Sequence, residues 1–116
     1  MSRMERESDK KQRKLINYTV QTYMNERDMK FAESQWQERK KEYLPRLKEA
    51  GLKKMTGMRI WNKEGAFSVG WVFEYESEKA FKNCRPIWQE IYRIEQSEYP
   101  LKTLPFRGVV IYEEDL

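Results

Sequence analysis

The chain has 116 residues, of which 36% are charged, 39% hydrophobic and 14% aromatic, and its formal net charge is +4. This length predicts a single domain, and the aromatic content is too high for a disordered chain. One cysteine excludes a disulfide framework, and the absence of histidine excludes His-dependent metal sites and catalytic triads. No apolar run approaches the roughly 18 residues of a membrane span, so none is expected.

The beginning of the chain is basic. Residues 1–14 hold six basic and three acidic side chains, and we expect a solvated tail or an extra helical turn there. A single domain is predicted to follow at residues 15–116. No apolar segment comes after Arg3 and Arg6, so we expect no secretory signal and predict a cytoplasmic protein.

The first half of the domain predicts a strand and then a long helix. Residues 15–24 alternate polar with β-branched or aromatic side chains, which is typical of a half-buried strand. Residues 25–28 supply the N-cap of a helix, Gly51 its C-cap, and Pro45 is expected to kink or restart it. The apolar positions of this helix recur at helical spacing: Met29, Ala32, Trp36, Tyr43, Leu47 and Ala50.

A hairpin is predicted in the middle of the chain. Residues 52–61 form its first strand, residues 62–65 a compact turn in which Gly65 takes a positive φ, and residues 67–75 its second strand. Alternation places five large side chains of the second strand on one face, which we expect to pack against the helices: Phe67, Val69, Trp71, Phe73 and Tyr75.

The rest of the chain predicts a second helix and a last strand. Ser77 is its N-cap, Pro86 is expected to kink it, residues 99–105 form a loop and residues 107–112 a strand. The apolar stripe of this helix is Ala80, Phe81, Cys84, Ile87, Trp88, Ile91 and Ile94. The resulting βαββαβ order predicts an α+β, ferredoxin-like fold, with an antiparallel sheet and both helices on one face.

The two faces of this sheet are expected to differ. We place Ile16, Tyr18 and Val20 toward the helices, because they are the larger apolar residues of the first strand. The opposite face then collects small and polar residues, with Arg59 or Trp61 nearby: Asn17, Thr19, Gln21, Ser68, Gly70, Val72 and Glu74.

RNA binding is the less favoured use of that second face. RNA-recognition domains share this strand order and stack bases on sheet aromatics. Here Gly70-Trp71-Val72 comes nearest to the required motif, but Glu74 stands where an aromatic residue is needed. A nucleic-acid partner is therefore not expected.

The chain resembles the dimeric α+β barrel superfamily, which includes antibiotic-biosynthesis-monooxygenase-like and stress-responsive barrel proteins. Length, strand order and the strand-to-helix passage at residues 73–81 (FEYESEKAF) carry this resemblance, which spans roughly residues 15–112. It implies a homodimer formed by pairing of the sheets and a small cavity between sheet and helices. It also implies cofactor-independent chemistry on a small aromatic or lipid-like ligand. Haem degradation, which needs an axial histidine, is excluded.

Candidate catalytic residues are Asn17, Glu74 and Arg59, because amide, carboxylate and guanidinium groups can position a substrate and stabilise an anion. The resemblance implies the amide role for Asn17 and a helix-borne tryptophan at Trp88. Further pocket-lining candidates are Thr19, Gln21, Trp61, Ser68 and Trp88. Ordinary alternatives stay open, since the tryptophans on apolar stripes are also expected in a core and Arg59 can form a surface pair with Glu74. We predict no metal and no cofactor.

Two classes of function remain. The leading hypothesis is a small-molecule pocket protein with monooxygenase-, cyclase- or isomerase-like activity that needs no cofactor. The alternative is a non-catalytic interaction or stress-response protein, in which residues 1–14 serve as a partner-binding arm.

Overall fold

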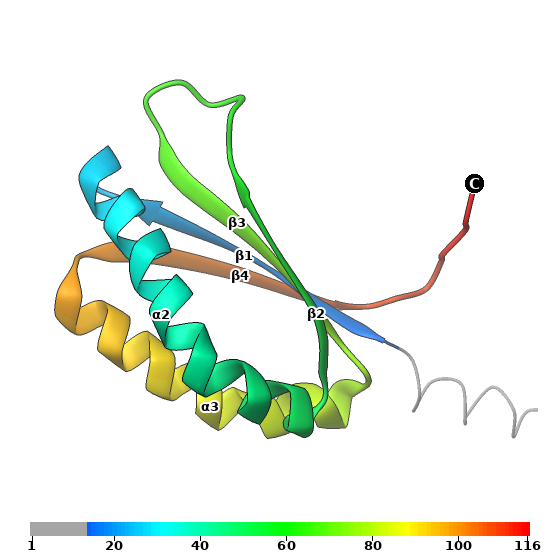
Figure 1. Cartoon of the computed structure of the whole chain (residues 1–116). Coiled ribbons are helices and arrows are strands. Elements are labelled where there is room, and N and C mark those ends of the chain that lie inside the picture. Colours follow the sequence, from blue (N-terminus) through cyan, green and yellow to red (C-terminus); the bar gives the residue numbers. More distant parts are fainter. Residues whose placement is uncertain (1–13) are drawn as a thin grey trace, which may run out of the picture.

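A computed structural model describes residues 14–116 and shows a four-stranded sheet with two helices on one face (Figure 1). The predicted tail or helical turn at residues 1–14 lies outside the described residues, apart from Lys14. The elements in chain order are β1 (Leu15–Tyr23), α2 (Glu26–Ala50), β2 (Leu52–Arg59), β3 (Phe67–Tyr75), α3 (Glu78–Glu98) and β4 (Leu101–Val109). The predicted ferredoxin-like, βαββαβ fold is confirmed.

The sheet is antiparallel, with strand order β2-β3-β1-β4, so β1 is a central strand. The middle of β1 is paired on both sides: Thr19 lies opposite Trp71 on β3 and opposite Pro105 on β4. Both helices cover the same face of the sheet, as Figure 1 shows. Side chains that β1 directs to that face therefore lie at the centre of the domain.

The predicted helix ends are confirmed. The Asn25 side chain accepts a hydrogen bond from the Asp28 amide at 2.8 Å, and Ser77 accepts one from the Ala80 amide at 3.1 Å. Gly51 ends α2 with φ 115°, a left-handed conformation that favours glycine. Both helices continue through their internal prolines, so the expected restart at Pro45 does not occur.

The predicted orientation of β1 is wrong. Its odd-numbered residues, including Asn17 and Thr19, face the helices and are buried, whereas Ile16, Tyr18 and Val20 lie on the outer face and are only half-buried. Leu15 and Tyr23, at the two ends of β1, determine which residues face inward, because each belongs to a core cluster. Since strand side chains alternate strictly, anchoring both ends turns the three polar residues between them inward.

The predicted loop at residues 99–105 and strand at residues 107–112 are also misplaced. β4 begins at Leu101, ends at Val109 and includes Pro105. β4 is an edge strand, and proline is tolerated there because its missing N–H can fall on the side without a neighbouring strand. Proline is thus a weaker sign of a loop at the edge of a sheet than in its centre.

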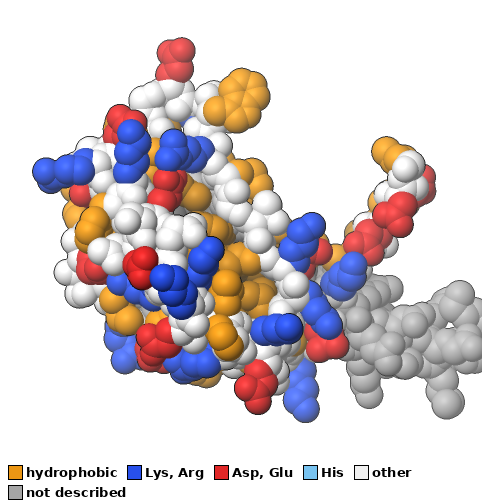
Figure 2. Space-filling model, in the orientation of Figure 1, with side chains coloured by type: hydrophobic (Ala, Val, Ile, Leu, Met, Phe, Trp, Pro, Cys, Tyr) orange, Lys and Arg blue, Asp and Glu red, His pale blue; other side chains and the backbone are white. Residues whose placement is uncertain are grey.

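The helices carry charges of both signs on their outer surface, and Figure 2 shows basic and acidic side chains interspersed there. Two ion pairs join α2 to α3: Arg39 Nη2 lies 2.6 Å from Glu98 Oε1, and Arg46 Nη2 lies 3.1 Å from Glu90 Oε2. Within residues 14–116, no helix is both long and apolar enough to cross a membrane.

The core consists of two clusters along the interface between sheet and helices. The larger one surrounds Leu47, Tyr75 and Cys84, and the smaller one contains Tyr23 and Tyr99. Cys84 is buried in the larger cluster like a small hydrophobic residue, and burial raises the pKa of its thiol. A cavity lies in the same interface.

Candidate functional site

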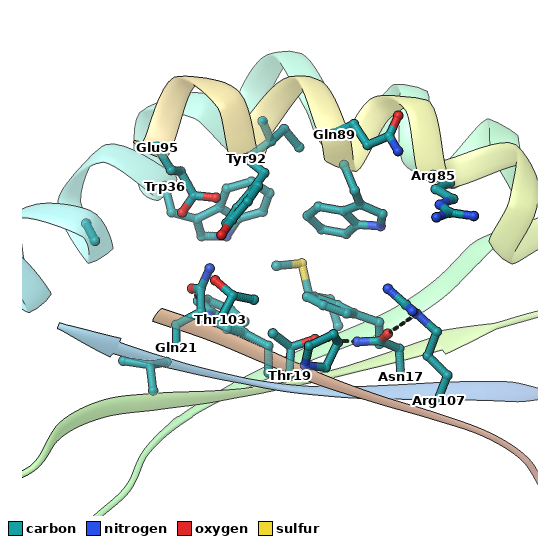
Figure 3. A pocket seen from close by; sticks show the side chains of 18 of the residues that line it. Asn17, Thr19, Gln21, Trp36, Arg85, Gln89, Tyr92, Glu95, Thr103 and Arg107 are labelled. Atoms are coloured by element: carbon teal, nitrogen blue, oxygen red, sulfur yellow. Dashed lines mark hydrogen bonds between the residues drawn. The ribbon is translucent and has the colours of Figure 1, made fainter. Parts of the chain in front are cut away.

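A cavity of about 370 Å³ lies between the sheet and the helices (Figure 3). Its floor comes from all four strands, with Met55 as the contribution of β2, and its roof comes from α2 and α3. The volume falls within the range of sites for small organic molecules. The cavity exists because the central part of β1 carries short polar side chains where a packed core would hold larger apolar ones.

Aromatic rings form the walls. Trp36 of α2 lies 6.3 Å from Trp88 of α3 and 6.4 Å from Trp71 of β3, measured between ring centroids. Phe73 lies 4.6 Å from Trp88 and is stacked nearly parallel to Trp71, at 6.4 Å and 9°. Contacts among these rings fix their orientation, so the walls present preformed flat surfaces to a ligand.

One end of the cavity is cationic. Arg107 of β4 donates from Nε to Asn17 Oδ1 at 3.0 Å, and Asn17 Nδ2 donates to Thr19 Oγ1 at 2.6 Å. Arg85 of α3 lies at the same end, together with Gln89 (Figure 3). The Asn17 amide is therefore oriented by two neighbours and holds the Arg107 guanidinium at the cavity.

The other end holds a carboxyl group. Glu95 of α3 accepts a hydrogen bond on Oε2 from the Tyr99 hydroxyl at 3.2 Å. Gln21 lies across from it, and its Oε1 accepts from Trp71 Nε1 at 3.1 Å and from the Tyr23 hydroxyl at 3.2 Å. Burial raises the pKa of Glu95 above its ordinary value, although the Tyr99 hydroxyl and Arg39 act in the opposite direction.

Glu95→Gln is expected to stabilise the fold at neutral pH, on the order of 1 kcal/mol. Because the native pKa of Glu95 is raised, the carboxyl favours folding below its ordinary pKa of 4.5 and costs stability once it ionises. The gain from the neutral amide should therefore be absent below about pH 4 and grow as the pH rises.

Urea unfolding at several pH values measures this effect. Glu49→Gln serves as the matched control, because Glu49 is an exposed carboxylate on α2. A gain at neutral pH no larger than that of the control would contradict the assignment of Glu95 as a half-buried charge that costs stability.

Two polar atoms at the cavity are buried without a hydrogen-bond partner among residues 14–116. They are Trp88 Nε1 and Thr103 Oγ1. Both residues line the cavity. A buried donor or acceptor without a partner costs on the order of 1–3 kcal/mol, so these atoms mark positions where a ligand would be stabilised.

The sequence-predicted site residues separate into two groups. Asn17, Thr19, Gln21 and Trp88 line the cavity. The others do not: Glu74, Ser68, Arg59 and Trp61.

Each residue of the second group has another position. Ser68 contacts Thr22 on the outer face of the sheet at 3.0 Å, and Glu74 lies on that face too. Trp61 is 90% exposed beyond the end of β2. Arg59 binds Glu33 of α2 at 2.8 and 2.6 Å, so the predicted Arg59–Glu74 pair is wrong.

The cavity also has polar and charged lining residues that are absent from the sequence-based set, among them Arg85, Glu95, Thr103 and Arg107. A signal for the first two was present, since residues 85, 88, 92 and 95 recur at helical spacing next to the apolar stripe of α3. The two β4 residues depend on strand bounds that the prolines obscured. Among residues 14–116, no three side chains of the metal-binding types come together.

Solved structures share this architecture. Two dimeric ferredoxin-like proteins, both from uncultured marine organisms, superpose with TM-scores of 0.82 and 0.77 at 21% and 26% identity. The first match covers 88% of this chain and the second 89%, and each covers 99% of the other chain. A monooxygenase from the gene ActVA-Orf6 of Streptomyces coelicolor, in complex with the ligand nanaomycin D, has a TM-score of 0.60 at 12% identity, covering 90% of this chain and 95% of that chain.

These likenesses confirm the resemblance to the dimeric ferredoxin-like and monooxygenase-like proteins at the level of the fold. No curated protein matches the sequence significantly. Residues 12–110 match the family described as a domain of unknown function (DUF6974), and the chain therefore belongs to that family.

Proposed function

We propose that this protein binds a planar aromatic small molecule in the cavity between sheet and helices and oxygenates it without a cofactor. The observation that carries the proposal is the cavity of about 370 Å³ with aromatic walls and polar groups at both ends. Flat ligands suit such walls, because aromatic rings gain both apolar burial and favourable ring-to-ring contacts.

The polar ends supply what oxygenation of a phenol or enol requires of a protein. Glu95 lies at the cavity and can accept the hydroxyl proton, which leaves an electron-rich anion that can transfer an electron to O₂. The raised pKa of Glu95 makes it a stronger base than an exposed carboxylate. The likeness to the Streptomyces coelicolor monooxygenase supports this reaction class.

Anthrone is a suitable probe, because its enol is a planar phenol and its oxidation balances with O₂ alone: anthrone and O₂ give anthraquinone and water. We expect wild-type protein, treated with a chelator, to consume O₂ with anthrone and release anthraquinone. Glu95→Gln should slow this reaction about 100-fold, the typical contribution of a general base, while the control Glu49→Gln should not. O₂ uptake equal in wild type and Glu95→Gln would contradict the proposal.

We further propose that the protein is a homodimer that pairs the outer faces of two sheets. That face carries Tyr18 and Val20 together with Leu104 and Phe106, which are 57% and 56% exposed. Large exposed apolar patches mark interaction sites, and two of the similar structures are dimeric.

Native mass spectrometry should give twice the chain mass of 14.2 kDa. Leu104→Glu combined with Phe106→Glu should give the monomer, and a monomeric wild type would contradict this arrangement.

A further inference from the structure

The cavity has ends of opposite charge. Asn17, Arg85 and Arg107 lie at one end, and Glu95 with Gln21 and Thr103 lies at the other (Figure 3). Aromatic rings separate the two groups, so a bound molecule must present a different chemistry at each end.

The two arginines of the cationic end have no acidic partner within residues 14–116. Arg39, Arg46 and Arg59 each form an ion pair with a glutamate, at distances between 2.6 and 3.1 Å. Arg107 instead donates to the neutral Asn17 amide, and no carboxylate of the described residues lies within ion-pair distance of Arg85. The two guanidinium groups at the cationic end, which have no counter-ion among the described residues, form a site for an anion and above all for a planar carboxylate.

The opposite end can accept a hydrogen bond from a ligand. Glu95 accepts a hydrogen bond on Oε2 from the Tyr99 hydroxyl, and among residues 14–116 the Gln21 amide is the other side-chain donor beside it. The Gln21 Oε1 atom already accepts hydrogen bonds from Trp71 and Tyr23. A ligand hydroxyl at this end would donate to Glu95 and accept from the unpartnered Thr103 hydroxyl.

We propose that the ligand is an aromatic carboxylate with a hydroxyl group at the opposite end of its ring system. Its carboxylate lies against Arg85 and Arg107, its rings pack against the aromatic walls of the cavity, and its hydroxyl donates to Glu95. This inference rests on the proposed function and adds to it the substrate class and its direction of binding. The ring hydroxyl then stands next to the group that takes up its proton.

Three related probes test this inference by calorimetric titration of the full chain near neutral pH. They are 6-hydroxy-2-naphthoate, 2-naphthoate, which lacks the hydroxyl, and 2-naphthol, which lacks the carboxylate. We expect the first to bind at least about tenfold more tightly than either of the others, since each end contributes a charge-assisted hydrogen bond.

Variants assign each gain to its residues. Arg85→Met combined with Arg107→Met should weaken 6-hydroxy-2-naphthoate at least about tenfold and leave 2-naphthol within about twofold. Arg27→Met combined with Arg93→Met is the matched control, because it removes the same charge from exposed helix positions that do not line the cavity. Arg85→Met is also titrated alone. This single variant keeps the Arg107–Asn17 hydrogen bond, so it tests the cationic end even if the double variant does not fold.

The outcomes separate the two proposals. If all three probes bind with equal affinity, or if the control variant weakens the carboxylates as much as the cavity variant, the substrate class is wrong while aromatic binding stands. If none of the probes binds, the proposed function fails together with the inference. Selective loss of the carboxylate gain in the Arg85 and Arg107 variant establishes the direction of binding.

Discussion

Gly51→Ala is expected to lower the free energy of unfolding by about 3 kcal/mol or more, because two penalties combine. Gly51 has φ 115°, where an L residue is strained by roughly 1–2 kcal/mol. An added Cβ would also lie 2.3 Å from Ala80 Cβ, so α2 and the start of α3 would have to separate. Overpacking of this kind costs about 1–3 kcal/mol.

Two other glycines separate these penalties. Gly65 has φ 75° but open space around it, and Gly108 has neither a positive φ nor a close neighbour. In urea unfolding, Gly65→Ala should cost about 1 kcal/mol and Gly108→Ala less than about 0.5 kcal/mol. If Gly51→Ala cost no more than Gly65→Ala, the close contact between the end of α2 and α3 would be refuted.

Thr103→Phe is expected to weaken binding of 2-naphthol about 100-fold, which corresponds to roughly 2.7 kcal/mol. Thr103 lies on β4 opposite Gln21 and lines the cavity. A phenyl ring there would occupy the volume that the ligand needs. The ring fills an existing cavity and removes a buried hydroxyl that has no partner among residues 14–116, so the fold should keep its stability.

Leu104→Phe is the matched control for Thr103→Phe. Leu104 is the next residue of β4 and lies on the outer face of the sheet, so the same new side chain points away from the cavity. Calorimetric titration should give wild-type affinity for the control. Equal weakening by both variants would mean that the effect comes from β4 itself, and unchanged affinity in Thr103→Phe would place the ligand elsewhere.

The sequence predicts most of the fold because its local signals agree with one another. The N-cap residues, the left-handed Gly51 and the five alternating large residues of β3 each indicate an element that the structure contains. β4 was misplaced because Pro105 signals a loop except in an edge strand, and edge position is a property of the whole sheet.

The candidate site was less accessible to prediction, and β1 shows why. Ranking its residues by size directs Ile16, Tyr18 and Val20 inward, but the strand ends fix the opposite phase through Leu15 and Tyr23. That reversal puts Asn17 in the interior, where its polarity is satisfied by Thr19 and Arg107. The sequence alone does not show that a polar residue such as Asn17 can be buried, because the partner that satisfies it comes from a distant strand.

The central claim is that the cavity between sheet and helices holds an aromatic ligand, and a crystal structure of the protein with bound 2-naphthol tests it most directly. We predict density for the naphthalene rings in the cavity, packed against the exposed faces of the Trp36, Trp71 and Trp88 rings, with the hydroxyl at Glu95. Naphthol bound on the outer face of the sheet, with water alone in the cavity, would contradict the account.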